Sequence, residues 1–320
     1  MQGGEATLRR LLHPLAGALA DPDTREVVVN RPGSYGVENT TGWHWYDAPE
    51  LTYRVLEAIT ILAARATGQE IGSRRAFCSS RLPDGGRISM SRPPLMPPDI
   101  ISLTIRKRAT SFTPTLGWMG ERGWFDFLPD TRDWVAWFRD RVEARWTFAF
   151  TGETGSSKTT AAEACIRAIP LHERIVTVES APEWLDLPHR NWVPHLYAQA
   201  GQEGFGLPSA EEVLEHALRE RPDRILFGEL RTGEAWGYMR ALQAGHRGSI
   251  TTAHTDPGRE GFLDAVGLMV RQNAHSAGVP ERTVRRLLEK QVNVVVHCAK
   301  VPGDPVPYRA THLDVISEPA

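Results

Sequence analysis

The chain has 320 residues, of which 41% are hydrophobic and 24% charged, a composition typical of a folded globular protein rather than a disordered or membrane-spanning one. Its 37 basic and 39 acidic residues give a net charge of -2, which excludes a strong overall positive field that would attract nucleic acid. At this length two domains are the default expectation.

The first part of the chain is predicted to form a small α+β domain, residues 1–125. Arg31-Pro32-Gly33 is expected to close its first strand with a turn, and a Pro-rich loop separates its last two. The expected helices are 8–19 and 51–67, and the expected strands are 26–30, 87–91 and 100–107.

The second part, residues 138–320, is predicted to be an α/β domain, because strands and helices alternate as they do in parallel sheets with crossover helices. We place a linker at 126–137, within a stretch rich in aromatic, Gly, Pro and acidic residues. The expected strands are 147–151, 174–178, 224–227, 249–252 and 292–298, and the expected helices are 158–168, 210–219, 234–244, 259–272 and 281–290.

Cysteine usage and hydropathy favour a cytoplasmic protein. Cys78, Cys165 and Cys298 match neither a disulfide framework nor a CxxC zinc knuckle. The first 21 residues mix charged and apolar side chains, so we expect no signal peptide, and no apolar run approaches the ~20 residues that a spanning helix needs. The protein is therefore expected to be soluble, or peripheral at a membrane at most.

The sharpest motif follows the predicted strand 147–151 and runs into the helix at 158–168. It is close to a Walker A sequence, whose backbone N–H groups surround a nucleotide phosphate. Lys158 would bridge the β- and γ-phosphates, and the Thr159 hydroxyl would coordinate magnesium. The candidate nucleotide-binding residues are Gly152, Glu153, Thr154, Gly155, Ser156, Ser157, Lys158, Thr159 and Thr160.

Ser157 departs from the motif, because the pattern has its final glycine at that position. Glycine is favoured where the backbone needs a positive φ or must approach a ligand closely. A serine there is expected to affect nucleotide affinity or the rate of turnover more than the identity of the site.

Two carboxylates are expected at the same edge of the sheet. Glu229 ends the apolar strand that begins at Arg224, where it could reach the magnesium shell or the attacking water. Glu179 follows the strand 174–178 and could orient that water. Without a phosphate-binding loop, each would be read as an ordinary polar residue at a strand end.

Two histidines, His246 and His254, flank the predicted strand 249–252. An imidazole can donate a hydrogen bond to a γ-phosphate oxygen and so distinguish ATP from ADP. His254 is the stronger candidate, and a structural role for His246 remains equally open.

In this order the motifs resemble the secretion traffic ATPase superfamily, which carries a Walker A loop, an acidic box, a Walker B motif and a histidine box. The resemblance assigns Lys158 and Thr159 to nucleotide binding, Glu179 to the acidic box, Glu229 to Walker B and His254 to the histidine box. It implies a RecA-like P-loop domain with a mostly parallel sheet, preceded by the smaller α+β domain, with ATP and Mg²⁺ as the cofactors.

The first half is similar to the type IV secretion and conjugation branch in Val29-Asn30-Arg31-Pro32-Gly33, in Arg92-Pro93-Pro94 and in Ser102-Leu103-Thr104-Ile105-Arg106-Lys107. In that branch N-terminal arginines approach the phosphates, so the resemblance makes Arg92 and Arg106 catalytic candidates. Three scattered cysteines cannot supply the four-cysteine zinc motif of the type II secretion relatives. Ser180 stands where the acidic box usually has aspartate, and Glu183 matches its second carboxylate.

The resemblance implies a homo-oligomer, a hexamer, that hydrolyses ATP to power a type IV secretion or conjugal DNA-transfer apparatus, with inner-membrane components of that machine as partners. Ser157 and Ser180 keep open a nucleotide-binding assembly subunit that hydrolyses little. A nucleic-acid motor on the same core is a second alternative, although the net charge gives no reason to expect direct nucleic-acid binding. A small-molecule kinase is a third, with no acceptor site evident in the sequence.

Overall fold

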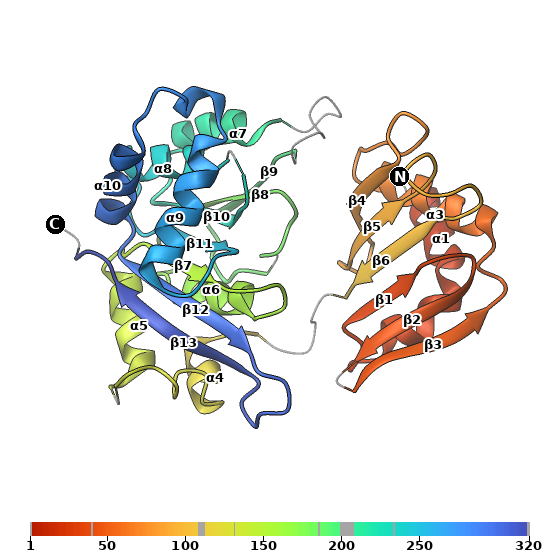
Figure 1. The fold of residues 1–320 in the computed structure, drawn as a ribbon, viewed down its shortest axis with the longest axis horizontal. Coiled ribbons are helices and arrows are strands. Elements are labelled where there is room, and N and C mark those ends of the chain that lie inside the picture. Colours follow the sequence, from red (N-terminus) through yellow and green to blue (C-terminus); the bar gives the residue numbers. More distant parts are fainter. Residues whose placement is uncertain are drawn as a thin grey trace. The chain divides into compact units, whose positions relative to one another are not determined.

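The computed structural model describes residues 2–39, 41–107, 113–130, 132–184, 186–198, 208–232 and 234–318. The chain forms two compact units, Met1–Phe112 and Thr113–Ala320 (Figure 1). Each unit has its own sheet and its own hydrophobic core, so we describe each by itself.

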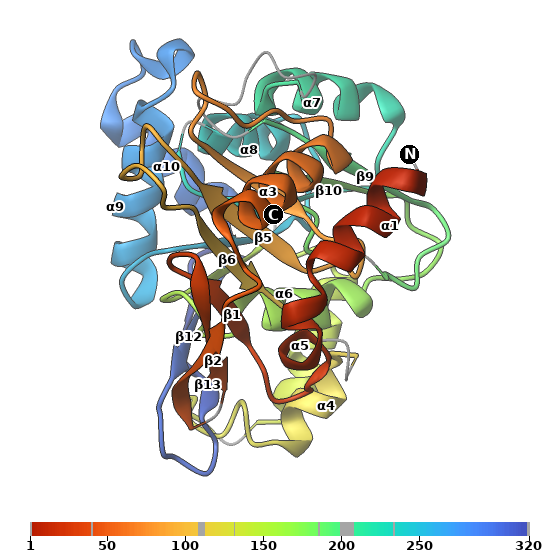
Figure 2. The same ribbon diagram turned by 90° about the vertical axis from the view of Figure 1, so that its right-hand side faces the viewer.

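The first unit is a six-stranded antiparallel sheet in the order β3-β2-β1-β6-β5-β4. Helices α1 and α3 lie side by side against it, as Figure 2 shows, and α3 begins where the Thr52 side chain accepts a hydrogen bond from the backbone of Val55. The strands are β1 Glu26–Val29, β2 Gly33–Asn39, β3 Gly42–Ala48, β4 Phe77–Arg81, β5 Arg87–Ser91 and β6 Ser102–Arg106, and the helices are α1 Gln2–Leu11, η1 His13–Leu15, α2 Ala16–Ala20 and α3 Tyr53–Ala66.

The core of the first unit explains why these segments assemble. Leu56, Ile59 and Ala63 recur at helical spacing on α3 and are fully buried. They belong to one cluster with Val27 and Ile105, which point inward from neighbouring strands. The apolar side chains that recur about every 3.6 residues on the helix thus cover the apolar side chains that recur every second residue on the strands.

The second unit has a seven-stranded sheet in the order β13-β12-β7-β11-β10-β8-β9. Adjacent strands from β12 to β9 are parallel, and β13 pairs antiparallel with β12. The strands are β7 Phe148–Thr151, β8 Ile175–Glu179, β9 Trp192–Leu196, β10 Arg224–Leu230, β11 Ile250–Ala253, β12 Val294–Lys300 and β13 Tyr308–Val315.

Helices cover both faces of this sheet (Figure 1). One cluster joins α4, α5 and α6 to one face, and the other joins α7 to α10 to the opposite face. Both faces of the parallel strands are therefore buried, which explains their nearly continuous apolar sequences. The helices are α4 Leu116–Glu121, α5 Trp134–Glu143, α6 Lys158–Arg167, α7 Ala210–Ala217, η2 Leu218–Glu220, α8 Glu234–Gln243, α9 Gly258–Arg271, η3 Ala274–Ser276 and α10 Glu281–Gln291.

The aromatic stretch taken as a linker at 126–137 belongs to the second unit, which corrects that prediction together with the expected domain limits at 125 and 138. Trp134, Trp137 and Phe138 are buried, and the Phe138 ring lies 5.1 Å from that of Phe125. The aromatic residues are a packing face on the sheet, because their large apolar area is more stable buried than exposed in a linker.

Other differences concern elements that depend on distant partners. The helix expected at 8–19 is divided into α1, η1 and α2, with Pro14 in the short 3₁₀ segment. Strands β2, β3, β4, β9 and β13 were not predicted. In the part of the chain that the structure describes, no helix combines the length and the apolar character needed to cross a membrane.

Candidate nucleotide-binding site

The candidate site lies at the carboxyl ends of the parallel strands, where open α/β sheets bind their ligands. The loop 152–157 joins the end of β7 to the start of α6. Glu179 ends β8, Glu229 lies near the end of β10, and His254 directly follows β11. The topology therefore brings to one edge residues that are about 100 positions apart in the sequence.

Three residues give the loop its curvature. Gly152 has φ 137°, Gly155 has φ 77° and Ser157 has φ 68°. A Cβ on Gly152 would lie 2.2 Å from the carbonyl oxygen of Cys298, so only glycine fits between the loop and β12. Ser157 adopts the left-handed conformation at the position where the motif normally has glycine. This conformation is strained for a residue that carries a Cβ atom.

The loop presents polar groups suited to an anion. The Lys158 side chain crosses the loop and donates a hydrogen bond from Nζ to the Glu153 carbonyl at 3.1 Å. The Ser156 hydroxyl is buried with no hydrogen-bond partner among the described residues. Because α6 starts at Lys158, its free N–H groups and positive dipole end face the same place. A phosphate group would satisfy these donors.

Glu179 is almost fully buried, and burial raises the pKa of its carboxyl group to about 8. Its Oε1 accepts hydrogen bonds from the backbone N–H groups of Glu183 at 2.8 Å and Trp184 at 3.3 Å. These bonds fix the orientation of the carboxyl group. A carboxyl with a pKa near neutrality can take up and release a proton at physiological pH.

Space for Glu179 is provided by the neighbouring strand. A Cβ on Gly228 would lie 3.1 Å from the Cγ of Glu179, so the glycine before the Walker B carboxylate allows the acidic side chain to pack across β10. The Thr252 hydroxyl donates to the Gly228 carbonyl at 2.8 Å, which ties β11 to β10 where their register shifts. Thr252 and Gly228 thus position the carboxylates.

Glu229 lies between two other site residues. Its Oε2 accepts a hydrogen bond from Arg231 Nε at 2.7 Å, and its Oε1 lies 2.9 Å from His254 Nε2 without the alignment of a hydrogen bond. Burial and the positive charge of Lys158 lower the pKa of His254, which keeps its imidazole neutral near pH 7. The structure therefore groups Lys158, Glu229 and His254, as the motifs predicted.

His246 lies at the opposite edge of the sheet, because it precedes the amino end of β11. The suggestion that it contacts a γ-phosphate is therefore wrong, and only His254 of the two histidines lies at the candidate site. A histidine that the sequence did not single out is found there instead. His297 is paired with Thr151 in the β12–β7 register, and its Nδ1 lies 3.0 Å from the Thr151 hydroxyl.

Arg92 and Arg106 both belong to the first unit, at opposite ends of the β5–β6 pair, so the structure does not group them. Arg92 donates to Glu57 Oε1 at 2.7 Å and is largely buried. Arg106 is exposed at the end of β6. Of the two, Arg106 has the more accessible guanidinium group.

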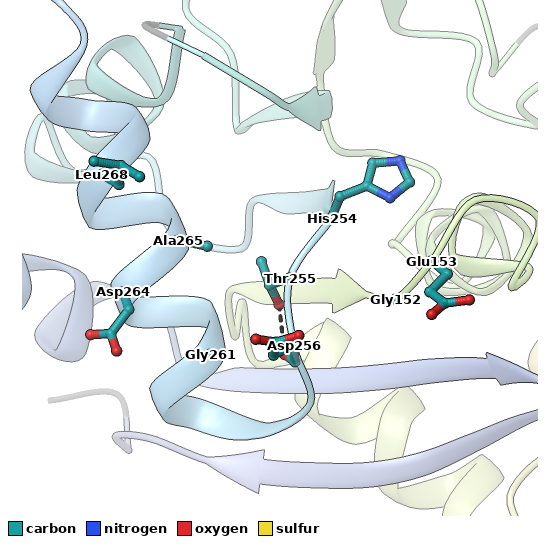
Figure 3. A pocket seen from close by; sticks show the side chains of 9 residues that line it. All are labelled: Gly152, Glu153, His254, Thr255, Asp256, Gly261, Asp264, Ala265 and Leu268. Atoms are coloured by element: carbon teal, nitrogen blue, oxygen red, sulfur yellow. Dashed lines mark hydrogen bonds between the residues drawn. The ribbon is translucent and has the colours of Figure 1, made fainter.

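An open pocket of about 560 Å³ lies beside the loop and extends to α9 (Figure 3). The carboxylates of Glu153, Asp256 and Asp264 line it, with His254 at one side. Three carboxylates repel a triphosphate, so the place for the anion is the loop around Lys158 rather than this pocket.

Comparison with known proteins identifies the family. Residues 135–298 match the family described as "Type II/IV secretion system protein". Protein VirB11 of Agrobacterium fabrum is 36% identical over 308 residues, covering 90% of this chain and 88% of that protein. The type IV secretion system protein VirB11 of Bartonella quintana is 33% identical, covering 91% of this chain and 89% of that protein.

Solved structures agree. The VirB11 ATPase from the Brucella suis type IV secretion system, in complex with sulphate, is 33% identical with a TM-score of 0.52, and the alignment covers 98% of this chain and 95% of that one. The Legionella pneumophila ATPase DotB shares the fold at 17% identity, with a TM-score of 0.63 and coverage of 96% and 79%. The expected RecA-like domain after a smaller N-terminal domain is confirmed. The chain therefore belongs to the type II/IV secretion system protein family, and within it to the VirB11 ATPases of type IV secretion systems.

Proposed function

We propose that this chain hydrolyses magnesium ATP at the carboxyl edge of the second unit's sheet, and that the released free energy powers a type IV secretion or conjugal-transfer apparatus. The observation that carries the proposal is the grouping of Lys158, Glu229 and His254 beside a loop with an unsatisfied buried hydroxyl. The buried hydroxyl can form hydrogen bonds that the described residues do not supply, so a polar ligand would satisfy it.

Each residue has a proposed role. The backbone of 152–157 and the Lys158 ammonium hold the β- and γ-phosphates. The Thr159 hydroxyl and Glu229 would hold Mg²⁺, and the ion would supply positive charge to neutralise the charge that develops on the phosphates. His254 donates a hydrogen bond to the γ-phosphate, and the remaining members of the loop, including Thr160, line the nucleotide.

Glu179 is the proposed general base for the attacking water. Its Oε1 is already held by two backbone N–H groups, whereas Oε2 is buried without a hydrogen-bond partner among the described residues, so Oε2 is the oxygen that would accept a hydrogen bond from the attacking water. A general base must be ionised, and burial raises the pKa of Glu179 to about 8 in the absence of nucleotide, so this role requires that the pKa falls when the substrate binds. The charge of a Mg²⁺ ion held near Glu179 would lower that pKa.

The wider assembly is also a proposal. We infer a homo-hexamer whose N-terminal arginines Arg92 and Arg106 approach the phosphates, with the inner-membrane components of the secretion machine as partners and a cytoplasmic location at that membrane. Bidentate guanidinium contacts suit this role. For Arg92 to serve, it must exchange its contact with Glu57 for one with phosphate.

Steady-state magnesium-ATP hydrolysis, measured over a range of protein concentrations, tests the proposal. Lys158→Ala should abolish turnover, whereas Lys290→Ala, at an exposed position on α10, should leave it unchanged. A rise in activity per subunit with concentration would support the oligomer. ATP binding without turnover in the wild type would instead favour an assembly subunit, and strong stimulation by DNA would favour a nucleic-acid motor.

A further inference from the structure

A cluster of two histidines and a glutamate lies apart from the residues of the nucleotide site. His195 is on β9, the edge strand of the second unit's sheet, and His216 and Glu220 come from α7 and the 3₁₀ turn that continues it. Their potential ligand atoms all lie within 4.8 Å of one another. None of the three has a role in the nucleotide chemistry proposed above.

The fold brings these side chains together. Val193 packs in the same core cluster as Val213 and Leu214 of α7, and His195 lies two residues further along the same face of β9. His216 and Glu220 are four residues apart and so project from one side of the helical segment. The backbone is fixed at both ends, because β9 is paired with β8 and the Glu220 carbonyl accepts a hydrogen bond from Arg174.

The distances suit a metal ion. His195 Nε2 lies 2.7 Å from Glu220 Oε2, and His216 Nε2 lies 3.7 Å from Glu220 Oε1. Tetrahedral zinc, with bonds of about 2.0–2.1 Å, separates its ligand atoms by roughly 3.3 Å. The observed separations lie on either side of that value, so small side-chain rotations would complete the arrangement.

The chemical types of the three side chains and their solvent exposure are also appropriate for binding a transition-metal ion. Two imidazoles and one carboxylate are ligands that suit Zn²⁺ and neighbouring transition metals, whereas Mg²⁺ prefers oxygen alone. Side-chain exposure is 20% for His195, 65% for His216 and 19% for Glu220, so an ion can enter and water can fill a fourth position. A carboxylate between two histidines also supplies the negative charge that a divalent ion needs.

We propose that His195, His216 and Glu220 form a binding site for a divalent transition metal of the zinc class, which fastens the edge strand β9 to α7. The site is structural rather than catalytic. It acts on the strand that pairs with the acidic-box strand, since His195 is in register with Val178, the residue before Glu179. The metal would replace the hydrogen bond between His195 and Glu220 and cross-link two elements that are otherwise joined by packing and by the chain between them.

The test uses the full-length chain without an affinity tag, titrated with Zn²⁺ by calorimetry in the absence of nucleotide. We expect one zinc ion per chain at this site. His216→Ala and Glu220→Gln should each weaken binding at least about tenfold, because even loss of an outer-shell partner costs that much. His172→Ala, which removes an exposed histidine elsewhere in the same unit, should bind zinc as the wild type does.

Two further readouts do not depend on the variants. Zinc at about 100 times its dissociation constant should raise the melting temperature of the wild type by roughly 5–10 °C. It should also protect His195 and His216, but not His172, from diethyl pyrocarbonate in a mass-spectrometric footprint. Failure of the wild type to bind zinc at micromolar concentrations, or unchanged binding by both variants, would overturn the proposal.

Discussion

Replacing Ser157 by glycine should stabilise the second unit. Ser157 has φ 68°, a left-handed conformation that costs an L-residue roughly 1–2 kcal/mol. Glycine removes that cost but makes the unfolded chain more flexible, which offsets about 0.5–1 kcal/mol. No capping bond is lost, because the Ser157 side chain makes none at the start of α6. The net expected gain is about 0.5–1 kcal/mol.

Thermal unfolding measures this gain. For a unit of this size, the melting temperature should rise by roughly 1–4 °C. Ala168→Gly, at the other end of the same helix, is the matched control: its φ of -85° suits alanine, so this variant should lose about 0.5–1 kcal/mol. If Ser157→Gly is no more stable than the wild type while Ala168→Gly behaves as expected, the reasoning from backbone strain is refuted.

Two further predictions concern buried charge. The raised pKa of Glu179 means that the folded state holds a proton which the unfolded state releases between pH 4.5 and about 8. As the pH rises through this range, the free energy of unfolding of the wild type should fall relative to that of Glu179→Gln by up to about 1.4 kcal/mol per pH unit. Denaturant titrations in which the two proteins show the same pH dependence would contradict the raised pKa. Arg224→Met should lower the free energy of unfolding in urea by about 3–5 kcal/mol, because it leaves Glu173 buried without the hydrogen bonds of 2.8 and 3.0 Å from the arginine. Adding Glu173→Leu should recover most of that stability, because no unpaired charge then remains buried. A double variant that is no more stable than Arg224→Met would contradict this reasoning.

The sequence predicted the parts of the site that are encoded locally. The loop from Gly152 to Thr159 combines an apolar strand, turn residues and a helix start, so its position could be inferred without any contact. Glu179 and Glu229 could be placed at the same edge because both end apolar strands of one parallel sheet. In each case the residues that predict the position of the side chain lie next to it in the sequence.

Other features depend on partners far along the chain. His297 is one histidine in an apolar run, and only the pairing of β12 with β7 brings it beside Thr151. Strand β9 contains Pro194, a residue that is rare in central strands and is tolerated here because β9 is at the edge of the sheet. Strand β3 lacks a buried face for most of its length, so it has no apolar alternation to detect.

The charged side chains at the two ends of the second unit's parallel strands differ in how fully they are hydrogen-bonded. At the amino ends, Arg224 bonds to Glu173 and to the carbonyls of Val142 and Gly248. At the carboxyl ends, the Ser156 hydroxyl and Glu229 Oε1 are buried without hydrogen bonds in the described parts of the chain. Arg224 thus anchors the amino ends with bonds that are already made, although the Ser249 hydroxyl there is also buried without a partner among the described residues, and the carboxyl ends are locally frustrated until a ligand binds. Nucleotide binding should consequently slow hydrogen exchange mainly at the carboxyl ends and leave the anchored ends almost unchanged.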